Sequence, residues 1–344
     1  MREEPRKQMN DELRQLVDDL ARRSYDARMG RHTRPESFDS ELWQHLEETG
    51  LSRLTTAEDA GPAEEAIVLA GLARRSAAVP VAETDLLAAW LAGRAGLEVP
   101  DSGPLTVAVC TGARRGGRIT GTARQVPWPR DATIVAAVRT EDGLHATVLD
   151  APEIADGVDL AGEPRGVVTI DVPESVCART EPELTEELLR RGAWARCVQT
   201  IGAFDAAAEL TAAHTRERVQ FGRALSRFQA VQHALAGMAG EIERARATVD
   251  LAVAAAAQYG FHSVATHYAV TVAKVTVGRA VEPVTTIAHQ LHGAIGVTVE
   301  HPLWLSTMRA RSCVDEFGTT AQHAGVLGRL ALSAADPWDV LVGP

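Results

Sequence analysis

The stretch that decides the fold reads Arg216-Glu217-Arg218-Val219-Gln220-Phe221-Gly222, and Phe228-Gln229-Ala230-Val231-Gln232 follows it closely. It lies between two long segments with helical patterning, Thr185–Arg216 and Ser226–Tyr259. A third such segment, Ser263–His292, carries a second set of motifs at its end: Gln290-Leu291-His292-Gly293-Ala294-Ile295-Gly296, then Pro302, then Phe317-Gly318-Thr319. The segments are apolar on wide faces and rich in Ala, which permits close helix packing. The pattern predicts a bundle of long helices, with a last helix from Thr319 or Thr320 toward Leu332.

The predicted secondary structure changes twice on the N-terminal side of this bundle. Residues 10–103 read as mostly helix, with Asp39 or Ser40 as one cap and Pro62 at the start of another helix. Between Pro104 and Val172 short β-type runs alternate with the turn formers Gly116-Gly117, Asp142-Gly143, Asp156-Gly157 and Gly162. Blocks of helix, strand and helix favour separate domains. We therefore expect a mostly α protein with a small antiparallel β domain, divided as 1–103, 104–178 and 179–344.

Composition narrows the class of protein. The 344 residues are 45% hydrophobic and 24% charged, which is ordinary for a globular chain. A net charge of −11 argues against nucleic acid or an anionic membrane as the main partner, although Arg114, Arg115 and Arg118 could form a local basic spot. The four scattered cysteines predict free thiols, and no signal peptide or long apolar run is visible. We expect a soluble cytoplasmic protein.

The two sets of motifs together resemble the C-terminal helical domain of the acyl-CoA dehydrogenase family, and their order and spacing match over about 100 residues. These flavoenzymes oxidise acyl-CoA thioesters between Cα and Cβ. The resemblance implies an N-terminal helical domain, a middle β domain and a C-terminal four-helix bundle through which subunits associate. It also implies flavin adenine dinucleotide (FAD) as cofactor and acyl-CoA as substrate.

The resemblance assigns cofactor contacts residue by residue. The position of Arg218 contacts the pyrophosphate of an FAD held mainly by a neighbouring subunit, a task that suits a planar, permanently charged guanidinium. Phe221 packs against the cofactor with Phe228 and Gln229 nearby, and the main chain of Gln290, Leu291, Gly293 and Ala294 wraps it. Gly293 and Gly296 would allow close approach. Taken alone, Arg218 could be a solvated cation at a helix end, and both Phe residues could be core.

The catalytic base of the family is missing from its usual place. Dehydrogenation needs a carboxylate within hydrogen-bond reach of the α-proton. The family has Tyr-Glu before the Gly-Thr pair, whereas this chain has Glu316-Phe317 before Gly318. Some relatives place the Glu in the first C-terminal helix, but counting back gives Gly192, beside Arg190 and Arg191. Glu316, one residue away, is the rival candidate, or it forms a solvated acidic pair with Asp315.

The middle domain lacks the family's contacts to the flavin ring. Cys110-Thr111-Gly112 runs straight into Ala113-Arg114-Arg115-Gly116-Gly117, and the usual Trp strand reads Gln125-Val126-Pro127-Trp128-Pro129. Prolines on both sides of Trp128 indicate an edge or a corner of the sheet. The chain should therefore not hold a flavin by itself.

Three readings follow. In the preferred one, the chain is a short subunit of a heterotetrameric (α2β2) acyl-CoA dehydrogenase, and it completes the flavin site of a homologous partner that supplies the base. The resemblance to the steroid-type enzymes implies a bulky, steroid side-chain acyl-CoA. The alternatives are a self-sufficient homo-oligomer that uses Glu316, and a non-enzymatic scaffold of the same fold. The histidines carry no metal-site spacing, so no metal is expected.

Overall fold

The computed structural model describes residues 3–30, 34–56 and 60–341. Its contacts group the chain into two compact units, each built from separate segments. A helical unit contains residues 1–32, 62–77 and 193–344, and a sheet unit contains residues 33–61 and 78–192. The expected division at residues 103 and 178 stays a prediction. The fold class, mostly helical with one β domain, is confirmed.

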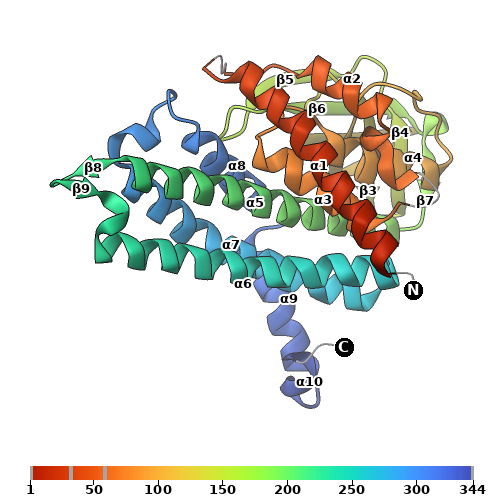
Figure 1. Ribbon diagram of the computed structural model, residues 1–344. Helices are drawn as coiled ribbons and strands as arrows, with labels where there is room; N and C mark the ends of the chain where they lie inside the picture. Colours follow the sequence, from red (N-terminus) through yellow and green to blue (C-terminus); the bar gives the residue numbers. More distant parts are fainter. Residues whose placement is uncertain (1–2, 31–33, 57–59, 342–344) are drawn as a thin grey trace. The chain divides into compact units, whose positions relative to one another are not determined.

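The helical unit is built from long helices. These are α1 (Glu3–Arg28), α3 (Pro62–Arg74), α5 (Glu183–Glu217, which begins in the sheet unit), α6 (Gln229–Tyr259), α7 (Val264–His292), α8 (Leu303–Asp315), α9 (Thr320–Ser333) and α10 (Pro337–Leu341). Helices α5, α6 and α7 run alongside one another, and a small hairpin projects where α5 ends (Figure 1). The predicted long segments agree with α5, α6 and α7 to within a few residues.

Local chemistry sets the ends of several helices. Pro62 is the first residue of α3, where its missing N–H costs nothing. Thr319 caps α9 in a capping box with Gln322, so the expected last helix is confirmed. In the sheet unit, α2 (Ser40–Glu48) begins after Asp39, whose carboxylate accepts the Leu42 N–H at 3.0 Å, as predicted. The short η1 (Leu51–Thr56), the π-helical η2 (Glu83–Ala89) and α4 (Trp90–Ala95) follow in the same unit.

A seven-stranded sheet forms the rest of the sheet unit, with the order β5-β6-β2-β1-β3-β4-β7. The strands are β1 (Leu105–Arg115), β2 (Arg118–Pro127), β3 (Thr133–Thr140), β4 (Gly143–Val148), β5 (Glu153–Val158), β6 (Pro164–Pro173) and β7 (Ala178–Thr180). Its core is a cluster of aliphatic side chains such as Ala108, Ile119, Ile134, Val138 and Ile170. The 3-10 turn η3 (Glu174–Val176) connects β6 to β7. Another, η4 (Leu225–Arg227), precedes α6 in the helical unit.

The sheet corrects two expectations. It is mixed, because β1 pairs in parallel with β3, from Leu105 opposite Thr133 to Thr111 opposite Arg139. Asp156-Gly157, expected as a turn, lies inside β5, an exposed edge strand. At Trp128, where an edge or a corner was expected, the structure has a corner: β2 pairs with both β1 and β6 and ends at Pro127, and a turn follows.

Two further expectations concern membrane spans and thiols. Among the described residues, no helix is both long and apolar enough to cross a membrane. Disulfides involve none of Cys110, Cys177, Cys197 and Cys313; Cys197 is buried and the other three are partly buried.

Candidate functional site

A β-hairpin with a two-residue turn follows the end of α5. Strands β8 (Val219–Gln220) and β9 (Arg223–Ala224) pair antiparallel, with Gln220 opposite Arg223. The turn residues Phe221 and Gly222 have φ of 53° and 80°, and two positive φ values are what a type I′ turn requires. The backbone N–H of Leu225 donates to Arg218 O at 2.9 Å and closes the hairpin. The chain therefore reverses direction directly after Arg218, the first residue beyond α5.

The hairpin presents its side chains outward. Phe221 is 89% exposed, and Arg218 and Gln229 are also exposed. Phe228 lies edge-on to Phe221, with ring centroids 6.1 Å apart, and the Arg223 guanidinium lies 4.1 Å over the Phe228 ring. An aromatic side chain displayed on a backbone with positive φ is strained and solvated, which costs stability without an evident gain to the isolated chain.

The second predicted segment lies at the end of α7. Gly293, with φ of 68°, ends the helix, and the 3-10 turn η5 (Gly293–Val297) follows. Gln290, Gly293 and Ala294 are exposed, and no atom lies within 4 Å of the place where a Cβ on Gly293 would stand. At Gly296 a Cβ would stand 2.7 Å from His292 Cβ, so that glycine serves packing. The open face at Gly293 is free for close approach by another molecule.

Three histidines join the two segments, a connection that the sequence reading missed. His214 on α5 stacks on His292 of α7 with ring centroids 4.5 Å apart, and His301 packs edge-on to His292 at 4.7 Å. His214 O accepts the Arg218 backbone N–H, and His292 lies within the Gln290–Ala294 segment. The stack of His214 on His292 therefore links the start of the β8–β9 hairpin to that segment. The sequence offers no signal for this, because the residues are 78 and 87 positions apart from His214.

Burial lowers the pKa of all three histidines. Burial, followed by the neighbouring histidines, lowers the pKa of His292 to about 4. Burial also lowers the pKa of His214, with Arg218 adding to the effect, and the pKa of His301. His292 Nδ1 lies 2.8 Å from Ala288 O, which makes Nδ1 the protonated nitrogen. Among the described residues, no group of three or more His, Cys, Asp or Glu side chains is arranged to hold a metal ion.

The Arg218 guanidinium fits an anionic ligand. In the described part of the chain no ion pair or side-chain hydrogen bond engages it, whereas the Arg223 guanidinium on the same hairpin lies over the Phe228 ring. With Phe221, Phe228 and Gln229 it offers a cation, two aromatic rings and an amide on one hairpin. This donor set suits a molecule that carries phosphates and a flat ring. The residues present fit part of an FAD site.

The runner-up base is bound by its own chain. Glu316 Oε2 accepts from Arg196 Nε at 2.6 Å, and Arg196 is only 3% exposed. Lys274, 1% exposed, donates to Val314 O at 2.8 Å and to Glu316 O at 2.7 Å, which caps the last carbonyls of α8. The Phe317 ring lies 5.6 Å from the Arg196 guanidinium. The Glu316 carboxylate is therefore engaged by a buried arginine of its own chain.

Arginines lie beside Gly192, the other position considered for a base. Arg191 lies 4.2 Å over the Trp90 ring and pairs with Glu187 at 2.9 Å. Asp85 lies on η2, five residues before Trp90, and is fully buried. Its carboxylate accepts the Thr55 N–H at 2.8 Å, and burial raises its pKa. Asp85 was missed by the sequence reading, although an acid inside an apolar run was the signal that could have found it.

The sheet unit offers no surface for a flavin ring at the expected places. Strands β1 and β2 join directly through Gly116-Gly117, so no long loop follows Gly112. Trp128 is 1% exposed, packs against Phe38 with ring centroids 6.0 Å apart, and donates its indole N–H to Glu163 at 3.1 Å. Arg114 pairs with Glu174 at 2.7 Å and Arg118 with Asp171 at 2.5 Å, so the expected basic spot is largely neutralised.

Comparison with known proteins agrees with this picture. Residues 183–332 match the family model for the acyl-CoA dehydrogenase C-terminal domain. The acyl-CoA dehydrogenase IpdE2 of Mycolicibacterium smegmatis is 26% identical over 322 residues, covering 87% of this chain and 94% of that protein. A variant of the Tcur3481-Tcur3483 steroid ACAD has a TM-score of 0.84 at 25% identity, over 95% of this chain and 98% of that one. For the ChsE4-ChsE5 complex of Mycobacterium tuberculosis the TM-score is 0.80 at 21% identity, over 94% and 97% of the two chains.

Proposed function

Because this chain belongs to the acyl-CoA dehydrogenase family, we propose that it acts as the FAD-completing subunit of a two-component acyl-CoA dehydrogenase. It would assemble with a homologous partner, with α2β2 stoichiometry, and would lend that partner Arg218, Phe221, Phe228, Gln229 and the segment Gln290, Leu291, Gly293 and Ala294. The observation that carries the proposal is the exposed hairpin: an unpaired arginine and a strained, solvated aromatic ring gain a purpose only against a second molecule.

In this assignment the chain's own residues bind and orient the cofactor. Arg218 would hold a phosphate oxygen, the two Phe rings would shield the cofactor from water, and the main chain beyond Gly293 would contact it closely. When bound, FAD accepts the hydride that leaves the substrate Cβ. The Cα proton would pass to a carboxylate of the partner, because Glu316 is paired with Arg196 in this chain. The product would be the α,β-unsaturated acyl-CoA.

Two similar structures support a substrate class for this proposal. One is a steroid ACAD, and another is a complex of two different subunits. A site kept in only one subunit of each pair would leave room for a bulky acyl group. We therefore assign a bulky, steroid-type acyl-CoA as the substrate, and the reaction as oxidation of a CH–CH bond.

Co-expression with the homologous partner tests this function. We expect the complex to carry flavin, measured by visible absorbance, and the isolated chain to be colourless. In the complex, Arg218→Ala should weaken FAD binding by about 10- to 100-fold, because a charge-assisted hydrogen bond is lost. The matched control is Arg216→Ala, which removes an exposed arginine from the same helix end and should change FAD affinity by less than about twofold.

Two results would contradict the proposal. One is an isolated chain that binds FAD stoichiometrically and desaturates an acyl-CoA. The other is a complex in which Arg218→Ala and Arg216→Ala have equal effects on FAD binding.

A further inference from the structure

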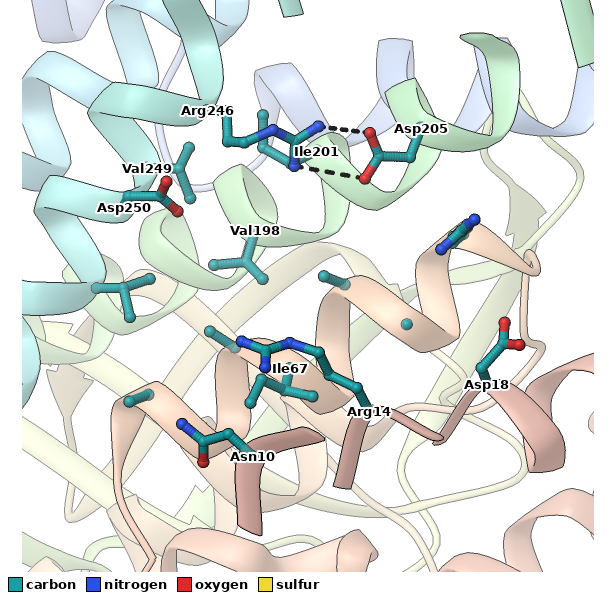
Figure 2. Close-up of a pocket in the computed structure, with 16 residues that line it drawn as sticks. Asn10, Arg14, Asp18, Ile67, Val198, Ile201, Asp205, Arg246, Val249 and Asp250 are labelled. Carbon is teal, nitrogen blue, oxygen red and sulfur yellow. Dashed lines mark hydrogen bonds and ion pairs between the residues drawn. The ribbon is translucent and has the colours of Figure 1, made fainter. Parts of the chain in front are cut away.

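A cavity of about 410 Å³ lies inside the helical unit, between α1, α3, α5 and α6 (Figure 2). It is separate from the hairpin described above. Its α5 lining ends at Asp205, twelve residues before Glu217 where α5 ends, which is about 18 Å along a helix. No residue assigned to the flavin site lines it. Its volume falls in the range of small-molecule sites.

The floor and walls of the cavity are apolar. Val198, Ile201 and Val249 are nearly fully buried and form the walls on α5 and α6. On α3 the lining residues include Ala66 and Ala70, whose small side chains leave the volume open. Because long helices supply all four sides, the cavity is formed before any ligand arrives, and binding needs little rearrangement.

The charged residues at the rim are mostly ion-paired, one pair within the lining and the others with residues just outside it. Arg246 forms an ion pair with Asp205 at 2.5 Å, the dashed contact in Figure 2. Asp18 pairs with Arg75 at 3.0 Å, and Arg74 pairs with Glu209. These pairs neutralise most of the rim, so the cavity favours a neutral ligand over a multiply charged one such as a nucleotide.

Two polar atoms in the lining lack partners. Within the part of the chain that the structure describes, Asn10 Oδ1 and Arg74 Nε are buried without any hydrogen bond. One is an acceptor and the other is a donor. An unsatisfied buried polar atom is unfavourable, so a ligand that carries both a donor and an acceptor would recover part of that cost.

We propose that this cavity is a second ligand site, which binds a neutral and mainly apolar small molecule that donates a hydrogen bond to Asn10 and accepts one from Arg74. The apolar walls bind the body of the molecule, and the two orphan atoms fix its orientation. The site stands independently of the flavin-completing function, because it uses different residues.

A fluorescence titration of the full chain with N-phenyl-1-naphthylamine tests the site. This probe is neutral, has apolar rings and carries one N–H donor. We expect saturable binding to the wild-type chain. Ala66→Phe fills the cavity and should weaken binding at least about tenfold, whereas Ala254→Phe, at an exposed position on α6 outside the lining, should change it by less than about twofold. Circular dichroism melts check that both variants fold.

A polar variant keeps the test decisive if Ala66→Phe fails to fold. Asn10→Leu removes the acceptor and should weaken probe binding about three- to tenfold, while Gln8→Leu on the exposed side of α1 should not. Absence of saturable binding, or equal effects of each variant and its control, overturns the proposal. Loss of probe binding when the homologous partner is added also overturns it, because the cavity would then be a subunit contact.

Discussion

Two hairpins of this molecule reverse the chain with nearly the same backbone but with different side chains. The β1–β2 turn uses Gly116 and Gly117, with φ of 57° and 74°, and glycine adopts these angles without strain. The β8–β9 turn uses Phe221 and Gly222, with φ of 53° and 80°. The first turn joins β1 and β2 directly, and the second displays an aromatic ring to solvent. Of the two turns, only the second places a non-glycine residue at positive φ, which the proposed function explains by the need for a displayed group.

The two units also differ in how these side chains are packed. In the sheet unit Trp128 is packed and hydrogen-bonded within its own chain. In the helical unit Phe221 is 89% exposed and contacts only the edge of Phe228 among the ring contacts of the described residues, and Arg218 is exposed. On the proposed function, the hairpin of the helical unit is completed by another molecule, whereas Trp128 serves the packing of its own unit. The following predictions test this contrast in order of expected effect.

Trp128→Ala should cause the largest change, a loss of about 3–5 kcal/mol in the free energy of unfolding, because it empties a large core position. Urea denaturation measures this. Trp338→Ala on α10, where the ring is 64% exposed, is the control and should cost less than about 0.5 kcal/mol. If instead Trp128→Ala left stability unchanged and removed flavin from the folded complex, Trp128 would be a cofactor residue and the contrast would fail.

Glu316→Gln should lower stability by about 2–3 kcal/mol, because it removes the negative charge that pairs with the buried Arg196. Turnover of the folded complex should stay within about twofold of wild type, since the base is assigned to the partner. Asp315→Asn, an exposed neighbour, should affect neither quantity. A loss of turnover of 100-fold or so in Glu316→Gln alone would place the base in this chain.

The histidine stack should make the hairpin end sensitive to acid. The pKa of His292 is about 4 in the folded chain and about 6.5 when unfolded, so the unfolded chain binds more protons between these values. Its stabilising contribution is complete above about pH 6.5 and is lost as the pH falls toward 4. We expect a loss of about 2 kcal/mol between pH 7.5 and pH 5, measured by urea denaturation at each pH. His292→Gln should reduce this loss, and exposed His233→Gln should not.

The smallest effect should come from the turns themselves. Phe221→Gly should stabilise the isolated chain by about 1 kcal/mol through relief of the positive φ, yet weaken FAD binding in the complex. Gly117→Ala in the other turn should destabilise by about the same amount and leave FAD binding unchanged. Thermal melts and FAD titrations separate the two. Equal signs for both variants would remove the distinction between the hairpins.

The sequence by itself determined the long helices, the Asp39 and Thr319 caps, and the location of a β domain, because helical periodicity and capping chemistry are local. Its motifs also placed Arg218, Phe221 and the Gln290–Ala294 segment near the ends of helices. The sequence did not predict the edge strand β5 or the parallel pairing of β1 with β3. Strand pairing depends on residues that are far apart in the chain.

Only the tertiary structure decided how these motifs are connected and what each side chain faces. It stacked His214 on His292, paired Glu316 with Arg196, and buried Trp128 beside Phe38. Each of these contacts joins residues that are dozens of positions apart. No local pattern encodes such contacts, because burial and charge pairing arise from the packing of whole helices and sheets.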